Sequence, residues 1–85
     1  MRAFMYTIKS PVGLHARHAG LLVKEISRYQ ADVRITRESK TANGRSVLAL
    51  MGLGVKQGDV IAVSVEGPDE DEAALRLKAF LWTNF

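Results

Sequence analysis

The hydrophobic and polar positions of this chain follow two periods, one typical of strands and one typical of helices. Apolar residues alternate with polar ones over residues 2–8 and 61–65, which predicts two strands with one buried face each. Shorter strands are expected at residues 33–35 and 40–42, and Asn43-Gly44 is a turn signal that ends the second of them.

Helical spacing of apolar residues predicts a first helix from about Ala16 to Tyr29. A second, short helix is expected over Val47–Leu53. Ser46 can cap its start, and Gly54 follows it as a residue that readily adopts left-handed backbone.

The last helix is predicted to begin after Asp69. Asp69 and Glu72 have the spacing of a capping box, and the acidic residues of this first turn complement the helix dipole. The expected inner face consists of Ala73, Ala74, Leu77, Phe80 and Leu81. The element order is therefore βαββαβα. Strands and helices with one apolar face each predict an α+β fold of two layers, a four-stranded antiparallel sheet with helices packed on one face.

Length and composition narrow the possible classes of protein. We expect the 85 residues to form one domain, residues 1–85, and 47% hydrophobic content is typical of soluble proteins. The absence of cysteine excludes disulfides and thiolate metal sites. No apolar run approaches the roughly 20 residues of a membrane span, and polar residues interrupt the N-terminal segment, so we expect a cytoplasmic protein without membrane insertion.

The net charge of +3 points weakly to acidic or phosphate-bearing partners. The basic residues are scattered and few aromatic residues lie among them, which disfavours nucleic-acid binding. A small RNA-binding or ligand-binding module is thus a weaker interpretation of the chain.

The strongest chemical signal is His15 at the predicted start of the first helix, with Arg17 two residues later. A helix start offers free backbone N–H groups and partial positive charge, which bind anions and disfavour imidazolium. A neutral imidazole there can hold a phosphoryl group covalently, and the Arg17 guanidinium can donate charge-assisted hydrogen bonds to it. The alternative is an ordinary polar helix start with a solvated arginine.

Three stretches together resemble the HPr family, the histidine-containing phosphocarrier proteins of the bacterial sugar phosphotransferase system. They are Gly13-Leu14-His15-Ala16-Arg17, the segment Ser46–Gly58 and Gly67-Pro68-Asp69-Glu70. The chain length and the element order agree as well. The resemblance implies an open-faced β-sandwich.

The resemblance also implies an activity and its partners. His15 would accept a phosphoryl group on Nδ1 from phosphorylated enzyme I, Arg17 would stabilise it, and the group would pass to the IIA domain of a sugar permease. Such a carrier needs no cofactor or metal and does not turn over phosphoenolpyruvate or ATP by itself. A regulatory or nitrogen-branch paralogue, not mainly engaged in sugar transport, is the alternative within the family.

Ser46 has two compatible interpretations, as a helix cap and as a phosphorylation site. In many Gram-positive members of the family the equivalent serine is the substrate of a dedicated kinase/phosphorylase. A phosphate here would lie at a helix start and change the local charge by about −2. We expect it to weaken docking to an acidic site on enzyme I and to favour a basic site on a catabolite-control transcription factor.

A helix of two turns cannot bury all of its apolar residues on one side. If the core takes Leu50 and Leu53, then Val47, Leu48 and Met51 form an exposed patch, and methionine adapts to several partners. We expect this patch to be a docking surface, completed by Gly20 and Lys24 on the neighbouring helix. The alternative is a core that wraps around the short helix.

His18 departs from the family, which commonly has proline at this place. Residues three apart on a helix are neighbours, so the rings of His15 and His18 can approach one another. His18 either binds phosphate when protonated or is merely tolerated, and the departure leaves the paralogue alternative open. Two histidines without a nearby carboxylate make a poor metal site.

Overall fold

The computed structural model describes residues 1–85 as four strands and three helices, in the predicted order βαββαβα. They are β1 (Arg2–Thr7), α1 (Ala16–Ile26), β2 (Asp32–Arg37), β3 (Lys40–Asn43), α2 (Val47–Met51), β4 (Val60–Glu66) and α3 (Glu70–Asn84). None of these helices is long and apolar enough to cross a membrane.

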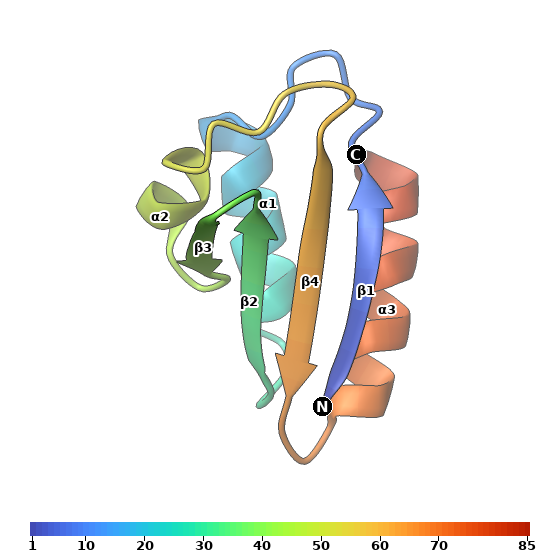
Figure 1. Cartoon of the computed structure of the whole chain (residues 1–85). Helices are drawn as coiled ribbons and strands as arrows, with labels where there is room; N and C mark the ends of the chain where they lie inside the picture. Colours follow the sequence, from blue (N-terminus) through green and yellow to red (C-terminus); the bar gives the residue numbers. More distant parts are fainter.

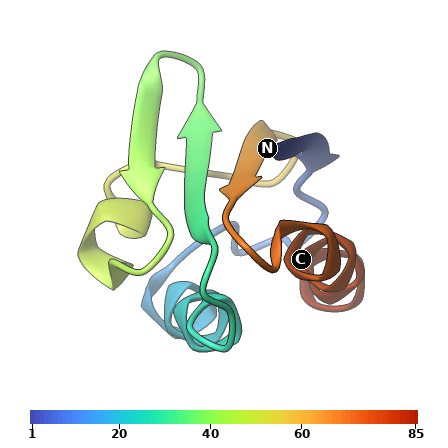
Figure 2. The ribbon, with the colours of Figure 1, turned by 90° about the horizontal axis from the view of Figure 1, so that it is seen from below.

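The strands form one sheet in the order β1-β4-β2-β3, and every neighbouring pair is antiparallel (Figure 1). Seen from below, α1 and α3 lie side by side under one face of this sheet, and α2 lies beside α1 near β3 (Figure 2). The other face of the sheet carries no helix. The predicted α+β open-faced sandwich is therefore confirmed.

The space between the sheet and the two long helices holds a core of 21 buried apolar residues. The alternation of β4 buries Ile61, Val63 and Val65, and Val63 lies opposite Ile35 of β2. Helix α1 buries Ala19, Leu22 and Ile26, and helix α3 buries Ala73, Leu77 and Leu81. Of the predicted inner face of α3, Ala74 and Phe80 are only partly buried, at the margin of this core.

Helix α1 is shorter than predicted, because it ends at Ile26 and not at Tyr29. The segment that follows is held by tertiary hydrogen bonds from Arg45. The Arg45 guanidinium donates to the carbonyl oxygens of Tyr29 and Ala31, at 2.7 Å and 3.0 Å. The buried Tyr29 side chain then donates to Glu25, at 3.0 Å, and the chain turns into β2.

The predicted capping box at Asp69 is wrong. Asp69 stands at the N-cap of α3, but its side chain accepts no hydrogen bond from this helix. Its carboxylate accepts instead from the backbone N–H groups of Gln30 and Ala31, at 2.9 Å and 2.8 Å. Asp69 thus ties the start of α3 to the turn before β2, a contact between segments far apart in sequence.

Candidate functional site

The loop that leads into α1 is held against the loop that follows α2, and Gly13 makes this contact possible. Its backbone is left-handed, with φ of +63°, and a Cβ atom here would overlap the carbonyl oxygen of Val55. The N–H of the next residue, Leu14, donates to that same carbonyl oxygen at 3.2 Å, and the Leu14 side chain is buried. The chain therefore enters α1 at a fixed position.

His15 is the N-cap residue of α1, and its side chain is exposed. Its Nδ1 atom accepts a hydrogen bond from the backbone N–H of Arg17, at 3.3 Å. The N–H groups of Ala16 and His18 have no hydrogen-bond partner in the protein. These free donors and the positive end of the helix dipole lie at the start of α1, where His15 stands, and a helix start of this kind attracts anions.

The rings of His15 and His18 are in direct contact. His18 Nδ1 lies 3.2 Å from His15 Nε2, and the two rings are nearly perpendicular, with centroids 4.7 Å apart. On its other side the His18 ring meets the ring of Phe85 edge to face, at 5.3 Å. Burial, followed by the nearby charges of His15 and Arg17, lowers the pKa of His18. No third His, Cys, Asp or Glu joins the pair to form a metal site.

Arg17, Gly20 and Lys24 lie on the part of α1 that does not face the core. Arg17 and Lys24 are exposed, and a Cβ atom added to Gly20 would meet no atom within 4 Å. The helix is therefore flat and open beside the histidine, so another protein can approach its backbone closely.

Helix α2 begins at the predicted cap. Ser46 Oγ accepts a hydrogen bond from the N–H of Ala49 at 3.1 Å. The helix ends earlier than expected, at Met51, although Leu50 and Leu53 are both buried as predicted. The short helix contacts α1 (Figures 1 and 2).

The exposed apolar surface of α2 is smaller than predicted. The side chain of Leu48 is 81% exposed and that of Met51 is 40% exposed. Val47 is partly buried and packs against the core, because it lies one helical turn before the buried Leu50. The patch on α2 thus consists of Leu48 and Met51.

Leu21 is a candidate docking residue that was not expected from the sequence. This side chain is 43% exposed on α1, and positions 17, 21 and 24 share one face of the helix. Leu21 does not belong to the buried set of α1, which is Ala19, Leu22 and Ile26. A leucine outside the buried stripe of an amphipathic helix is the signal that could have identified it.

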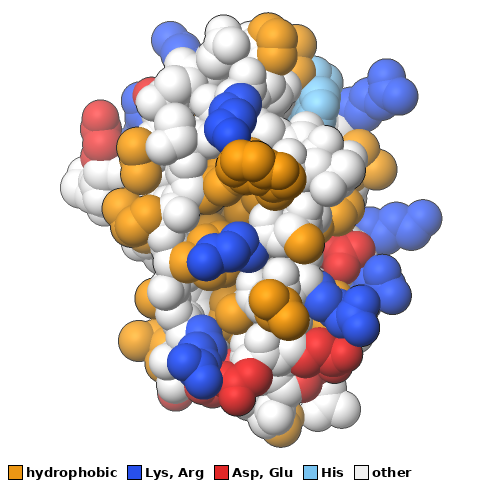
Figure 3. All heavy atoms as spheres, turned by 90° about the vertical axis from the view of Figure 1, so that its right-hand side faces the viewer, with side chains coloured by type: hydrophobic (Ala, Val, Ile, Leu, Met, Phe, Trp, Pro, Cys, Tyr) orange, Lys and Arg blue, Asp and Glu red, His pale blue; other side chains and the backbone are white.

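The outer side of α3 carries a second group of exposed apolar side chains, interspersed with basic ones (Figure 3). Leu75 is 72% exposed and Trp82 is 70% exposed. The Lys9 ammonium lies 3.6 Å from the centroid of the Trp82 ring, which is a cation–π contact. None of the residues predicted for the site lies on this helix.

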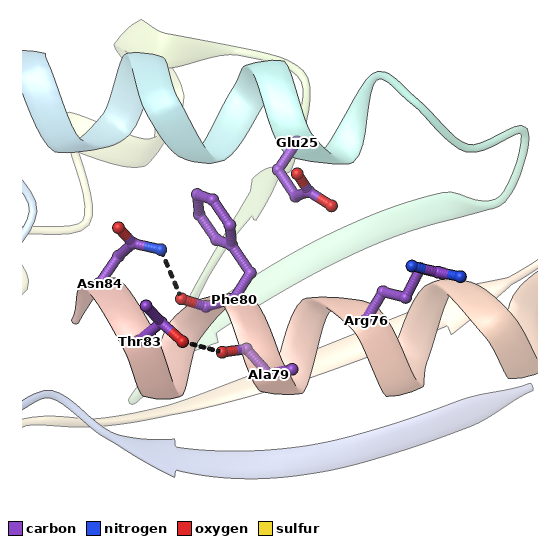
Figure 4. Close-up of a pocket in the computed structure, with 6 residues that line it drawn as sticks. All are labelled: Glu25, Arg76, Ala79, Phe80, Thr83 and Asn84. Atoms are coloured by element: carbon purple, nitrogen blue, oxygen red, sulfur yellow. Dashed lines mark hydrogen bonds between the residues drawn. The ribbon is translucent and has the colours of Figure 1, made fainter.

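A shallow groove runs between α1 and α3, lined by Glu25, Arg76, Ala79, Phe80, Thr83 and Asn84 (Figure 4). Its polar side chains are already engaged within the protein. The Asn84 amide donates to the Phe80 carbonyl, the Thr83 hydroxyl donates to the Ala79 carbonyl, and Glu25 accepts from Tyr29. The groove offers few free polar atoms to a ligand and contains none of the predicted site residues.

An open-faced α+β sandwich whose first helix begins at an exposed histidine makes this chain a small histidine-containing α+β domain. The family model described as the PTS HPr component phosphorylation site matches residues 3–82, and the chain belongs to this HPr family.

Similar proteins extend over almost the whole chain. The phosphocarrier protein HPr of Mycoplasma genitalium is 38% identical over 85 residues, covering 99% of this chain and 97% of that protein. The crystal structure of an HPr from Thermoanaerobacter tengcongensis matches with a TM-score of 0.94 and 36% identity, covering 100% and 96% of the two chains. The HPr-like protein Crh of Halalkalibacterium halodurans is 38% identical over 74 residues, covering 87% and 88%.

Proposed function

We propose that this protein carries a phosphoryl group on His15 in the cytoplasm, accepting it from phosphorylated enzyme I and passing it to IIA domains of sugar permeases. The observation that carries the proposal is the position of His15 Nδ1 among the N–H groups that begin α1. Membership of the HPr family supports the same conclusion.

Nδ1 is the nitrogen that fits the task. It faces the start of the helix, whereas Nε2 faces His18. A phosphoryl group on Nδ1 would replace the weak contact with the Arg17 N–H and would be stabilised by the free N–H groups of Ala16 and His18. The exposed Arg17 guanidinium would bind the phosphoryl oxygens as charge spreads over them during transfer.

The partners would bind across the exposed face of α1 and the adjacent α2. Leu21, Leu48 and Met51 supply exposed apolar area, and Lys24 supplies positive charge. Interfaces of this kind combine an apolar centre with a charged rim, so an acidic partner with an apolar centre fits. The phosphoryl donor supplies the free energy, and the protein acts as a carrier without independent turnover.

Ser46 is the proposed regulatory site. It lies at the start of α2, two residues before the exposed Leu48 and five before Met51. A phosphate here would add about −2 charge to the proposed docking surface, which opposes an acidic partner and favours a basic one. The similarity to the HPr-like protein Crh supports a second candidate function, in which regulation through Ser46 by a serine kinase/phosphorylase and a catabolite-control transcription factor predominates.

The deciding experiment is incubation of the protein with enzyme I and phosphoenolpyruvate, followed by phosphorus NMR of the product. We expect an acid-labile phosphohistidine in the wild type and none in His15→Ala. Arg17→Ala should slow the transfer by about tenfold to a hundredfold, because a charge-assisted hydrogen bond is lost, and should leave the melting temperature unchanged. Wild-type protein that stays unphosphorylated would refute the carrier function.

A further inference from the structure

The contact between the two histidines has a defined direction in the neutral protein. His15 Nδ1 accepts a hydrogen bond from the Arg17 N–H, so this nitrogen holds a lone pair. The proton of the neutral His15 ring is therefore on Nε2, which lies 3.2 Å from His18 Nδ1. For both rings to be satisfied, His15 Nε2–H donates and His18 Nδ1 accepts.

We propose that His18 is a positioning residue and proton acceptor for His15, which orients the ring with its Nδ1 lone pair toward the phosphoryl group and takes the Nε2 proton during transfer. This inference rests on the proposed carrier function and deepens it. The sequence alone predicts that His18 either binds phosphate directly or is merely tolerated in place of proline. The geometry gives its Nδ1 atom a different partner, the His15 ring.

Phosphorylation of His15 forms one bond to phosphorus, breaks another and moves one proton. The lone pair of His15 Nδ1 forms the new bond to phosphorus, and the bond from phosphorus to the donor breaks with its electron pair remaining on the donor. Positive charge then develops on the His15 ring, and the Nε2 proton moves to His18 Nδ1. The products are a neutral phosphoimidazole at His15 and an imidazolium at His18.

Delivery of the group reverses these movements. His18 returns its proton to His15 Nε2, the bond between phosphorus and Nδ1 breaks, and the electron pair stays on Nδ1. His15 leaves as neutral imidazole, which is a better leaving group than an imidazole anion. The pair thus begins and ends each cycle with both rings neutral.

The surroundings of His18 favour a neutral ring before phosphorylation and an imidazolium after it. Before phosphorylation the His18 ring is partly buried against Phe85 and lies near the positive charge of Arg17, so the neutral ring is favoured. The phosphoryl group would add about −2 charge next to the pair. Negative charge nearby favours the imidazolium, so the arrival of the phosphoryl group itself drives the proton toward His18.

Two variants distinguish the hydrogen bond that His18 accepts from its packing against Phe85. His18→Leu keeps an apolar contact with Phe85 and removes the acceptor. His18→Asn places an amide oxygen near the position of Nδ1, so it can accept the hydrogen bond from His15 but cannot take the proton. Helix starts tolerate both residues, and thermal unfolding of each variant checks that α1 is intact.

The hydrogen bond can be measured without any partner protein. In protein labelled with nitrogen-15 at histidine, we expect a scalar coupling across the hydrogen bond between His15 Nε2 and His18 Nδ1, at a pH where both rings are neutral. A free His15 ring, seen as an absent coupling together with a mixture of its two tautomers, would overturn the inference.

The transfer step is then measured with enzyme I and phosphoenolpyruvate. We expect His18→Leu to lower kcat/KM for phosphorylation about tenfold, and His18→Asn to recover only the part of this loss that comes from orientation of the His15 ring, because asparagine cannot take the proton. In the wild-type phosphoprotein, the NMR titration midpoint of His18 should lie higher than in the free protein. Equal rates in the wild type and His18→Leu, or an unchanged midpoint, would overturn the role of His18 and leave the carrier function standing. Absence of phosphorylation in the wild type would overturn both.

Discussion

The backbone of Gly13 lies directly against the carbonyl group of Val55, in a left-handed conformation that leaves no room for a side chain. This contact joins the loop before α1 to the loop after α2. Because His15 follows two residues later, the position of the candidate phosphorylation site depends on a glycine that has no chemical role of its own.

We therefore predict that Gly13→Ala lowers the free energy of unfolding by about 2–4 kcal/mol, from left-handed strain and from overlap with Val55. Urea denaturation measures it. Gly20→Ala is the matched control, because a Cβ atom at Gly20 meets nothing and alanine favours the helix. That variant should be more stable by about 0.5–1 kcal/mol. Equal stabilities for the two variants would mean that Gly13 is not tightly packed.

A second prediction distinguishes the tertiary role of Asp69 from a capping role. Asp69→Ser should lower the free energy of unfolding by about 1–3 kcal/mol, although serine is a good N-cap residue, because the N–H groups of Gln30 and Ala31 lose their acceptor. Hydrogen exchange at the Ala31 amide should accelerate in this variant. Glu72→Ala, which removes the other half of the supposed capping box, should lower the free energy of unfolding by less than about 0.5 kcal/mol, since the Glu72 carboxylate accepts a side-chain hydrogen bond only from the exposed Arg76.

The comparison of Asp69 with Ser46 shows what the sequence can and cannot predict. Both residues stand at helix starts, and both were predicted to cap. Ser46 does so, because its short side chain reaches the N–H three residues on. Asp69 binds a turn nearly 40 residues away in sequence, and no local pattern encodes that contact. The sheet was predictable because the alternation of apolar and polar residues is local. The end of α1 at Ile26 was not, because the following segment binds Arg45 and Asp69, which are distant in sequence.

In the candidate site, too, some features follow from local sequence and others depend on tertiary packing. The position of His15 at the start of α1 follows from helical periodicity, and the exposure of Leu48 follows from the shortness of α2. The partial burial of Val47 depends on the depth of packing under a five-residue helix, which spacing alone does not determine. The direct contact of His15 with His18 needed side-chain rotamers, because positions three apart permit the contact without requiring it.

A third prediction tests the docking surface with two leucines of similar exposure on different helices. Leu48→Asp should weaken binding to enzyme I about tenfold or more, because it places a charge at the apolar centre of the proposed interface. Leu75→Asp on α3 should leave the affinity unchanged, since α3 lies outside that surface. Isothermal titration calorimetry measures both. A larger effect at Leu75 would move the docking surface to α3.

A fourth prediction separates the two roles of Ser46. Ser46→Ala removes the hydrogen bond to the Ala49 N–H and should lower the free energy of unfolding by about 1 kcal/mol. Ser46→Asp keeps a side chain that caps well but adds negative charge beside Leu48 and Met51, so its stability should remain near that of the wild type.

The affinities should follow the opposite order. We expect Ser46→Ala to bind enzyme I as the wild type does, and Ser46→Asp to bind about threefold to tenfold more weakly at low ionic strength, because its carboxylate repels an acidic partner. Salt should reduce this difference, since exposed charges are screened within about 10 Å at 0.1 M. If Ser46→Asp bound with wild-type affinity at low salt, charge at this position would not control docking, and regulation through phosphorylation of Ser46 would need another mechanism.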